Sequence, residues 1–225
     1  MFSFFKKEKI EDEIAKRKEF VVVDTELTGL DEKKDGILSI GAIRMEDKRI
    51  LLGEVFYRLL NPQCEAQKST VLVHGITASE IKNSPHVCPI LKEFLDFAGN
   101  RTVVGHFVEI DIRFLRKEIK KWLKIYFNPT AIDTYIIFNW LVERGIIPKK
   151  YKGIKSLPDI AEAFNIKVER LHDALYDSFV TAQIFQRQIS LIQPLNLRWH
   201  DFLKKIGSPH VSGYMFGHHE RTYQI

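Results

Sequence analysis

The chain has little cysteine and lacks long apolar runs. Its 225 residues include only Cys64 and Cys88, without a C-x-x-C pair, which excludes a disulfide framework and a cysteine zinc site. The longest stretch without Asp, Glu, Lys or Arg, from Ile206 to His219, is polar and glycine-rich, whereas a membrane span needs roughly 18 apolar residues. The first residues, MFSFFKKEKIEDE, place apolar residues before charges, the reverse of a secretory signal. We therefore expect no membrane segment and a reducing, cytoplasmic environment.

The overall composition is that of an ordinary globular protein. Hydrophobic residues make up 45% and charged residues 28%, which excludes disordered, collagen-like and coiled-coil chains. The length favours one domain with extensions over two full domains. Lys and Arg exceed Asp and Glu by five, and the pI is about 9.1, a mild preference for a polyanionic partner.

Three regions are expected along the chain. Residues 1–18 alternate in charge and predict a solvated helical extension, and residues 19–192 form the folded domain. Residues 193–225 form a C-terminal extension with an amphipathic stretch at 195–206. That stretch either packs on the domain's own core or docks on a polymerase or a second subunit.

Hydrophobic periodicity predicts an α/β fold. Strands are expected at 20–23, 36–44, 50–59, 101–104 and near 131–132, and helices from Thr77 and at 87–98, 110–123, 134–143, 156–164 and 174–191. Three strands come first, and helices then alternate with strands. This order predicts a five-stranded mixed sheet flanked by helices.

Two carboxylates follow the first strand. Asp24 and Glu26 are two residues apart, so their side chains share one face of the strand end. Neighbouring anions repel unless one is protonated or a cation lies between them. Oxygen ligands suit Mg²⁺ or Mn²⁺ better than zinc. An ordinary exposed turn is the alternative interpretation of this segment.

Two further acidic positions are expected to face inward on helices. Asp111 lies in the first turn of a helix, and Phe114 and Leu115 share its buried side. Asp177 lies one turn inside a later helix that Asp173 caps. His172 directly precedes that helix, where it could act as a general base.

These three segments in this order resemble the motifs of the DEDD superfamily of 3′ to 5′ exonucleases. The match is to its histidine (DEDDh) branch, which includes the proofreading epsilon subunit of bacterial DNA polymerase III, and spans about residues 19–190. It is carried by Asp-x-Glu-x-Thr-Gly from Asp24, Gly105-His106 with a following Asp, and His-x-Ala-x-x-Asp from His172. Val73–Thr77 and Ile132–Thr134 add secondary matches. The resemblance implies an RNase H-like fold.

The resemblance also implies the roles of the site residues. Asp24, Glu26, Asp111 and Asp177 would hold two divalent ions, and His172 would be the base. The terminal nucleotide would be contacted by residues beside the first two motifs and before the first helix: Thr25, Leu27, Thr28, His74 and Phe107. Phe107 and Ile110 depart from the Asn and the aromatic residue that the family commonly has, and Leu27 replaces a common Thr.

Four lysines cluster before the helix that leads to the third motif. Lys149, Lys150, Lys152 and Lys155 either follow a phosphate backbone or form a solvated loop. The pair His218-His219 has no partner at zinc spacing.

We therefore predict a metal-dependent 3′ to 5′ exonuclease that releases 5′-mononucleotides from single-stranded or frayed DNA ends, in proofreading or repair. An exoribonuclease or oligoribonuclease on the same fold is the alternative. A noncatalytic subunit that binds nucleic acid or docks on a DNA polymerase is a third interpretation. Five retained acidic and histidine residues argue against it, because binding alone gives no reason to crowd carboxylates where a phosphate must lie.

Overall fold

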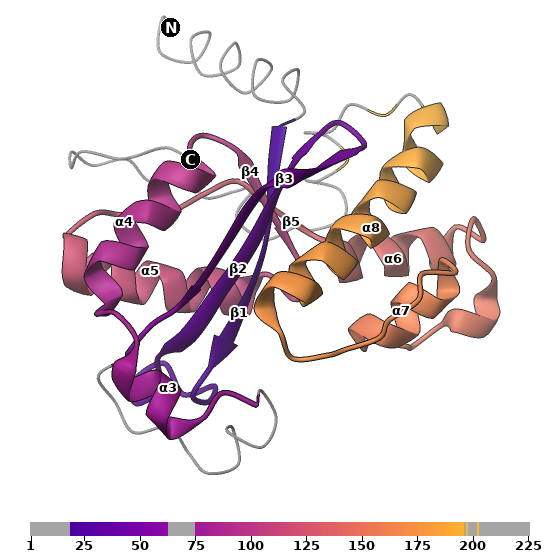
Figure 1. Ribbon diagram of the computed structural model, residues 1–225. Coiled ribbons are helices and arrows are strands. Elements are labelled where there is room, and N and C mark those ends of the chain that lie inside the picture. Colours follow the sequence, from indigo (N-terminus) through magenta and orange to yellow (C-terminus); the bar gives the residue numbers. More distant parts are fainter. Residues whose placement is uncertain (1–18, 63–74, 196, 198–201, 203–225) are drawn as a thin grey trace, which may run out of the picture.

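A five-stranded mixed sheet with the order β3-β2-β1-β4-β5 runs through the centre of the computed structural model (Figure 1). The structure describes residues 19–62, 75–195, 197 and 202. The strands are β1 (Glu19–Leu27), β2 (Ile37–Glu46), β3 (Arg49–Leu59), β4 (Thr102–Gly105) and β5 (Ala131–Asp133). β1, β4 and β5 are parallel to one another, and β2 is antiparallel to both β1 and β3. The predicted fold class is confirmed.

Helices cover both faces of this sheet (Figure 1). They are α3 (Ala78–Asn83), α4 (Val87–Ala98), α5 (Glu109–Leu123), α6 (Thr134–Glu143), α7 (Leu157–Ala163) and α8 (Ala174–Ile192), with short 3₁₀ turns at Lys149–Tyr151 and Gln193–Leu195. α3 begins at the expected place with a capping box, in which the Thr77 side chain accepts from the backbone N–H of Glu80. None of the described helices is both long and apolar enough to cross a membrane.

The two faces of β1 belong to two different hydrophobic cores. Val22 packs in the core formed with α6, α7 and α8, whereas Val21 and Val23 pack in the core formed with α4 and α5. Successive side chains of a strand point to opposite faces, so a strand covered on both sides must be apolar throughout. This is why Phe20–Val23 is an unbroken apolar run.

The carboxyl ends of the three parallel strands meet at one edge of the sheet. The register places Val22 beside Val104 and Gly105 beside Asp133, so β1 extends past its neighbour and presents Asp24 and Glu26 at its end. The helices that follow β4 and β5 begin at this same edge. In open α/β sheets this edge is where ligands usually bind.

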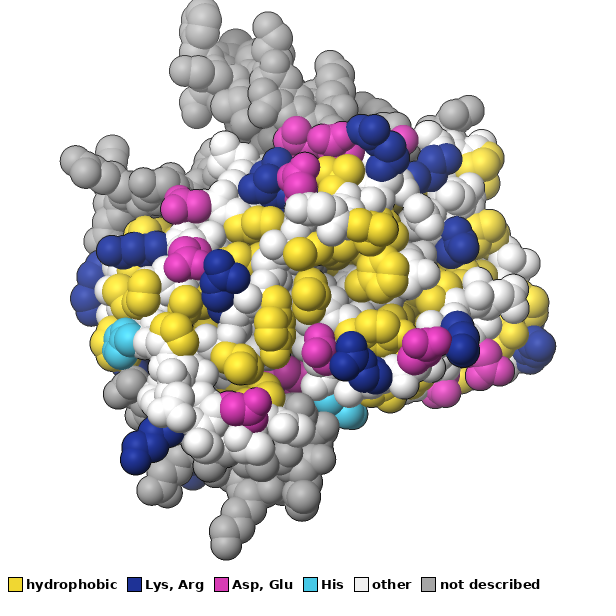
Figure 2. Space-filling model, in the orientation of Figure 1, with side chains coloured by type: hydrophobic (Ala, Val, Ile, Leu, Met, Phe, Trp, Pro, Cys, Tyr) yellow, Lys and Arg dark blue, Asp and Glu magenta, His cyan; other side chains and the backbone are white. Residues whose placement is uncertain are grey.

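β3 is the outer strand on one side of the described sheet. Leu52 and Val55 are exposed on it, and Figure 2 shows hydrophobic side chains gathered on this face with charged side chains of both signs around them. Arg49, Glu54 and Arg58 lie along the strand, and Arg58 pairs with Glu93 of α4. Charges on an outer strand oppose pairing with another chain.

Of the C-terminal extension, the structure describes Gln193–Leu195, Leu197 and Phe202. Phe202 is buried, and its ring centroid lies 4.9 Å from that of Trp140 in α6. At this residue the extension packs on the domain's own core, one of the two expected alternatives. The predicted helix at 1–18, His74 and the His218-His219 pair lie outside the described residues.

Candidate active site

Four carboxylates converge at the carboxyl end of β1. Asp24 and Glu26 come from the strand, Asp111 from the first turn of α5, and Asp177 from the first turn of α8. The charges of Asp111, Glu26 and Asp177 all raise the pKa of Asp24, after the larger effect of burial. The structure therefore brings together the four acidic residues predicted from the sequence.

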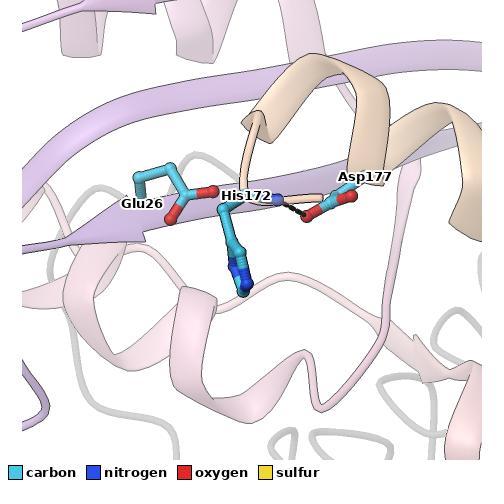
Figure 3. Close-up of side chains that lie close together, drawn as sticks. All are labelled: Glu26, His172 and Asp177. Carbon is cyan, nitrogen blue, oxygen red and sulfur yellow. Dashed lines mark hydrogen bonds between the residues drawn. The ribbon is translucent and has the colours of Figure 1, made fainter. Parts of the chain in front are cut away.

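Glu26, His172 and Asp177 form one side of this cluster. One potential ligand atom from each lies within 4.8 Å of the others, and Figure 3 shows the three side chains together. The backbone N–H of His172 donates to Oδ2 of Asp177 at 3.0 Å. His172 has a φ of 64°, a left-handed conformation that costs energy for a residue other than glycine. This hydrogen bond helps hold the conformation.

Asp24, Thr25 and Asp111 form the other side. The Thr25 hydroxyl donates to Oδ1 of Asp111 at 2.6 Å, which fixes the carboxylate in place. Burial nevertheless raises the pKa of Asp111 to about 7, since the Thr25 hydrogen bond only partly opposes it. Burial likewise raises the pKa of Asp177 to about 6, opposed by the backbone N–H of His172. Ionising these buried carboxylates therefore costs free energy in the metal-free protein.

A divalent cation fits this donor set. Oδ1 of Asp177 is buried and has no hydrogen-bond partner in the structure, although its other oxygen is satisfied. A buried carboxylate oxygen without a partner is costly. Carboxylate oxygens are the ligands that Mg²⁺ and Mn²⁺ prefer, and a cation would relieve the mutual repulsion of the four groups.

A cleft of about 360 Å³ opens beside the carboxylates. Its walls combine the acidic residues with apolar and small ones: Asp24, Thr25, Glu26, Leu27, Gly29, Leu30, His106, Phe107, Ile110 and Asp111. Leu30 is 69% exposed at its rim. With cations bound to the carboxylates, this cleft would suit a ligand that carries both a phosphate and a flat base.

The turn between β4 and α5 is held by Asp133 at the end of β5. Its carboxylate accepts from the backbone N–H groups of Phe107 at 3.3 Å, Val108 at 3.1 Å and Tyr135 at 2.8 Å. Phe107 has a φ of 53°, which is strained for a bulky side chain. Asn tolerates that conformation better than Phe, and the hydrogen bonds to Asp133 help hold it in this chain.

Some of the residues expected to contact the substrate line the cleft, and one is buried away from it. Leu27 and Phe107 line the cleft, and Thr25 lines it too while binding Asp111. Thr28 is fully buried; its hydroxyl donates to Asp35 at 2.9 Å and accepts from the N–H of Gly36 at 3.0 Å. Its hydroxyl therefore closes a turn, and the predicted contact with a nucleotide is not available to it.

Gly41 is a structural position that sequence reasoning missed. It lies beside Asp24 in the register of β1 and β2, and a Cβ on it would lie 2.1 Å from the carbonyl carbon of Ala174. Only glycine lets the start of α8 approach the sheet this closely. A glycine inside a strand is a signal for such an approach, and it was available in the sequence.

Sequence reasoning also missed the roles of Asp133, His106 and Leu30, although each residue lies within or beside one of the motifs. An Asp that ends a strand and caps the next helix is a common local pattern. The hydrogen bonds from the turn at Phe107 to the Asp133 carboxylate form only because β5 lies beside β4, and sequence spacing alone does not reveal this pairing.

Comparison with known proteins agrees with this geometry. Residues 21–185 match the RNase T exonuclease family model. The chain is 36% identical over 169 residues to the DNA polymerase III subunit epsilon of Aquifex aeolicus, covering 74% of this chain and 78% of that protein. It is 33% identical over 178 residues to the PolC-type DNA polymerase III of Thermotoga petrophila, covering 79% of this chain. The match spans only 12% of that polymerase's length.

The fold also matches a solved nuclease. The Escherichia coli exonuclease I complex with single-stranded DNA superimposes with a TM-score of 0.67 at 18% identity, over 84% of this chain and 43% of that one. Fold and site thus define an exonuclease of the DEDD type. The chain belongs to the RNase T exonuclease family, and its resemblance to the epsilon subunits is confirmed.

Proposed function

We propose that this protein is a metal-dependent 3′ to 5′ exonuclease that removes 5′-mononucleotides from single-stranded or frayed DNA ends. The single observation that carries the proposal is the convergence of Asp24, Glu26, Asp111 and Asp177 beside an apolar-walled cleft. The protein that shares 36% identity is named a polymerase III epsilon subunit, and the exonuclease I structure contains single-stranded DNA. Both support DNA as the substrate.

The metal-binding residues are proposed from the donor set. Asp24 is electrostatically coupled to both sides of the cluster, with Asp111 on one side and Glu26 and Asp177 on the other. This arrangement suits two Mg²⁺ or Mn²⁺ ions, which Asp24, Glu26, Asp111 and Asp177 would hold. When bound, such ions activate the attacking water and stabilise the charge on the leaving oxygen of a phosphodiester.

His172 is proposed as the general base. Its side chain is exposed and lies against Glu26 and Asp177, at the edge of the cluster where water has access. A neutral imidazole nitrogen in this position can accept the proton of the attacking water. The left-handed backbone at His172 and its hydrogen bond to Asp177 position the ring.

The terminal nucleotide is proposed to occupy the apolar part of the cleft. The apolar side chains that line the cleft would present surfaces to a flat base: Leu27, Leu30, Phe107 and Ile110. These contacts are independent of base identity, as a general exonuclease requires. The phosphodiester on the 5′ side of this nucleotide would then lie over the carboxylates, and the rest of the strand would lead away from the cleft.

A role in proofreading or repair, with a DNA polymerase as partner, is proposed from the named relatives. The two cysteines of the chain suit a reducing cytoplasm, where such a substrate is found.

The test is a timed digest of oligonucleotides labelled at either end, with Mg²⁺ or Mn²⁺ present. A bulky group on the 3′ hydroxyl should protect the strand, and the same group at the 5′ end should not. Cleavage of a circular single strand would contradict an exonuclease. Faster digestion of matched RNA than of DNA would instead support the ribonuclease alternative.

A further inference from the structure

The four clustered lysines lie in the short segment between α6 and α7 (Figure 1). Lys149, Lys150, Lys152 and Lys155 are all exposed. Among the described residues, none of them forms an ion pair with a carboxylate. Four positive charges within seven residues therefore face solvent without local neutralisation.

The backbone of this segment is ordered by its own hydrogen bonds. The N–H of Tyr151 donates to the carbonyl of Pro148 at 3.1 Å, and that of Lys152 donates to Lys149 at 3.0 Å. Tyr151 and Ile154 pack against the core formed with α6, α7 and α8. The lysines are thus displayed from a fixed backbone, which lowers the entropy cost of binding an anion.

His106 connects this segment to the cleft. It lines the cleft wall, and its Nε2 lies 2.8 Å from the backbone carbonyl of Lys155. Because a carbonyl can only accept, Nε2 carries the proton and donates. The segment that bears the lysines is therefore joined directly to the wall of the cleft, although the two are 49 residues apart in sequence.

Aromatic rings continue the cleft wall in the same region. The ring of Phe107 lies 4.5 Å from that of Tyr135 and 4.7 Å from that of His106, measured between centroids. Tyr135 is partly exposed and lies 6.1 Å from His106 by the same measure. A ring surface beside a lysine segment is the combination with which proteins bind single-stranded nucleic acid.

We propose that Tyr135 and the segment 149–155 form the track for the DNA strand upstream of the terminal nucleotide. The lysines bind its backbone phosphates, and Tyr135 stacks on a base just outside the cleft. This inference rests on the proposed exonuclease function and adds to it a second binding region. The track holds single-stranded DNA without sequence preference, since it contacts phosphates and base faces only.

The experiment replaces Lys149, Lys150, Lys152 and Lys155 by Gln and measures binding of a labelled oligothymidylate in EDTA. For single strands the logarithm of affinity falls with the logarithm of salt concentration by about 0.7 per neutralised phosphate, so the slope should decrease by up to about 3. A matched control replaces four exposed lysines, one in the middle of α4 and three at the C-terminal end of α5, by Gln: Lys92, Lys120, Lys121 and Lys124. The control changes net charge equally and should leave most of the slope intact.

A substrate without an upstream strand separates the track from the active site. Hydrolysis of the p-nitrophenyl ester of thymidine 5′-monophosphate should be the same in wild type and in the variant lacking the four lysines, whereas KM for long oligonucleotides should rise at least about tenfold in the variant. An equal loss of strand affinity in the control variant, or an unchanged salt slope in the test variant, would overturn the proposal. Failure of wild type to hydrolyse either substrate would instead reject the exonuclease function itself.

Tyr135 is tested with a pair of substitutions. Tyr135→Ala should raise KM for oligonucleotides of three or more nucleotides by about 5- to 100-fold, the usual range for losing one base stack, and Tyr135→Phe should keep wild-type KM. Equal KM values in all three proteins would remove Tyr135 from the track. A rise in Tyr135→Phe as large as in Tyr135→Ala would assign the effect to the hydroxyl and so contradict stacking.

Discussion

The backbone of Ala174 occupies the space that a side chain on Gly41 would fill. Ala174 is the first residue of α8, and Gly41 pairs with Asp24 in the sheet. This close approach of helix and strand brings Asp177 and His172 to the carboxylates of β1. The geometry of the acidic cluster therefore depends on a glycine that carries no chemistry.

Gly41→Ala should disrupt this approach. A Cβ 2.1 Å from the Ala174 carbonyl carbon forces α8 away from β2, which we expect to cost about 1 to 3 kcal/mol of stability and most of the hydrolytic activity. Urea unfolding and oligonucleotide digestion measure the two effects. Gly53→Ala is the matched control, because a Cβ there would meet nothing within 4 Å. Full activity in Gly41→Ala would show that the site tolerates displacement of the helix.

Asp177→Asn should abolish turnover and weaken Mn²⁺ binding. The substitution keeps the size of the side chain and removes its charge, and it replaces one carboxylate oxygen with an amide group that cannot accept in the same way. Calorimetric titration with Mn²⁺ and a digest of labelled DNA test the two expectations. Asp96→Asn, at an exposed position of α4, should change neither. Wild-type turnover in Asp177→Asn would remove this residue from the metal site.

The metal-free protein should lose stability as pH rises from about 4 to about 7. Asp111 has a pKa raised to about 7 and Asp177 one raised to about 6, so over this range the folded state holds protons that the unfolded state has released. Their contribution is therefore present at low pH and is lost as pH rises through the raised pKa values. One pKa unit corresponds to 1.36 kcal/mol, which limits the effect of Asp111 to about 4 kcal/mol.

Urea unfolding in EDTA at several pH values measures this dependence. Asp111→Asn should flatten it and stabilise the metal-free protein near neutral pH, because the neutral amide avoids the cost of a buried charge. Saturating Mg²⁺ should restore stability to wild type and have a smaller effect on the variant. A stability that rises with pH over this range would contradict the expected cost of charge at the site.

His172→Ala should lower turnover by about 10²- to 10⁴-fold, the usual contribution of a positioned base. At saturating Mn²⁺, the wild-type rate should increase with pH through an ionisation that the variant lacks, because only the neutral imidazole accepts a proton. Mn²⁺ affinity distinguishes a general base from a metal ligand. Replacing a base leaves the affinity unchanged, whereas replacing a ligand weakens it. His86→Ala is the control, since the His86 ring lies against Trp122, at the opposite end of α5 from Asp111. An unchanged pH profile in His172→Ala would exclude it as the base.

Local sequence determined the elements and the chemistry of the site. The unbroken apolar run Phe20–Val23 required a strand covered on both faces, and the carboxylates of Asp24 and Glu26 at its end required compensation by a cation or a proton. Asp173 capped α8 and so placed Asp177 one turn inside it, as expected. These outcomes depend on periods of two and of 3.6 residues, which neighbouring residues are sufficient to establish.

Tertiary structure alone decided which distant groups meet. It placed the Asp133 carboxylate on the turn at Phe107, the Thr28 hydroxyl against Asp35 instead of the cleft, and the carbonyl of Lys155 against His106. Each contact depends on the order and register of the strands and on how closely a helix approaches the sheet. Those quantities result from the packing of two cores on one sheet, which no local pattern along the chain specifies.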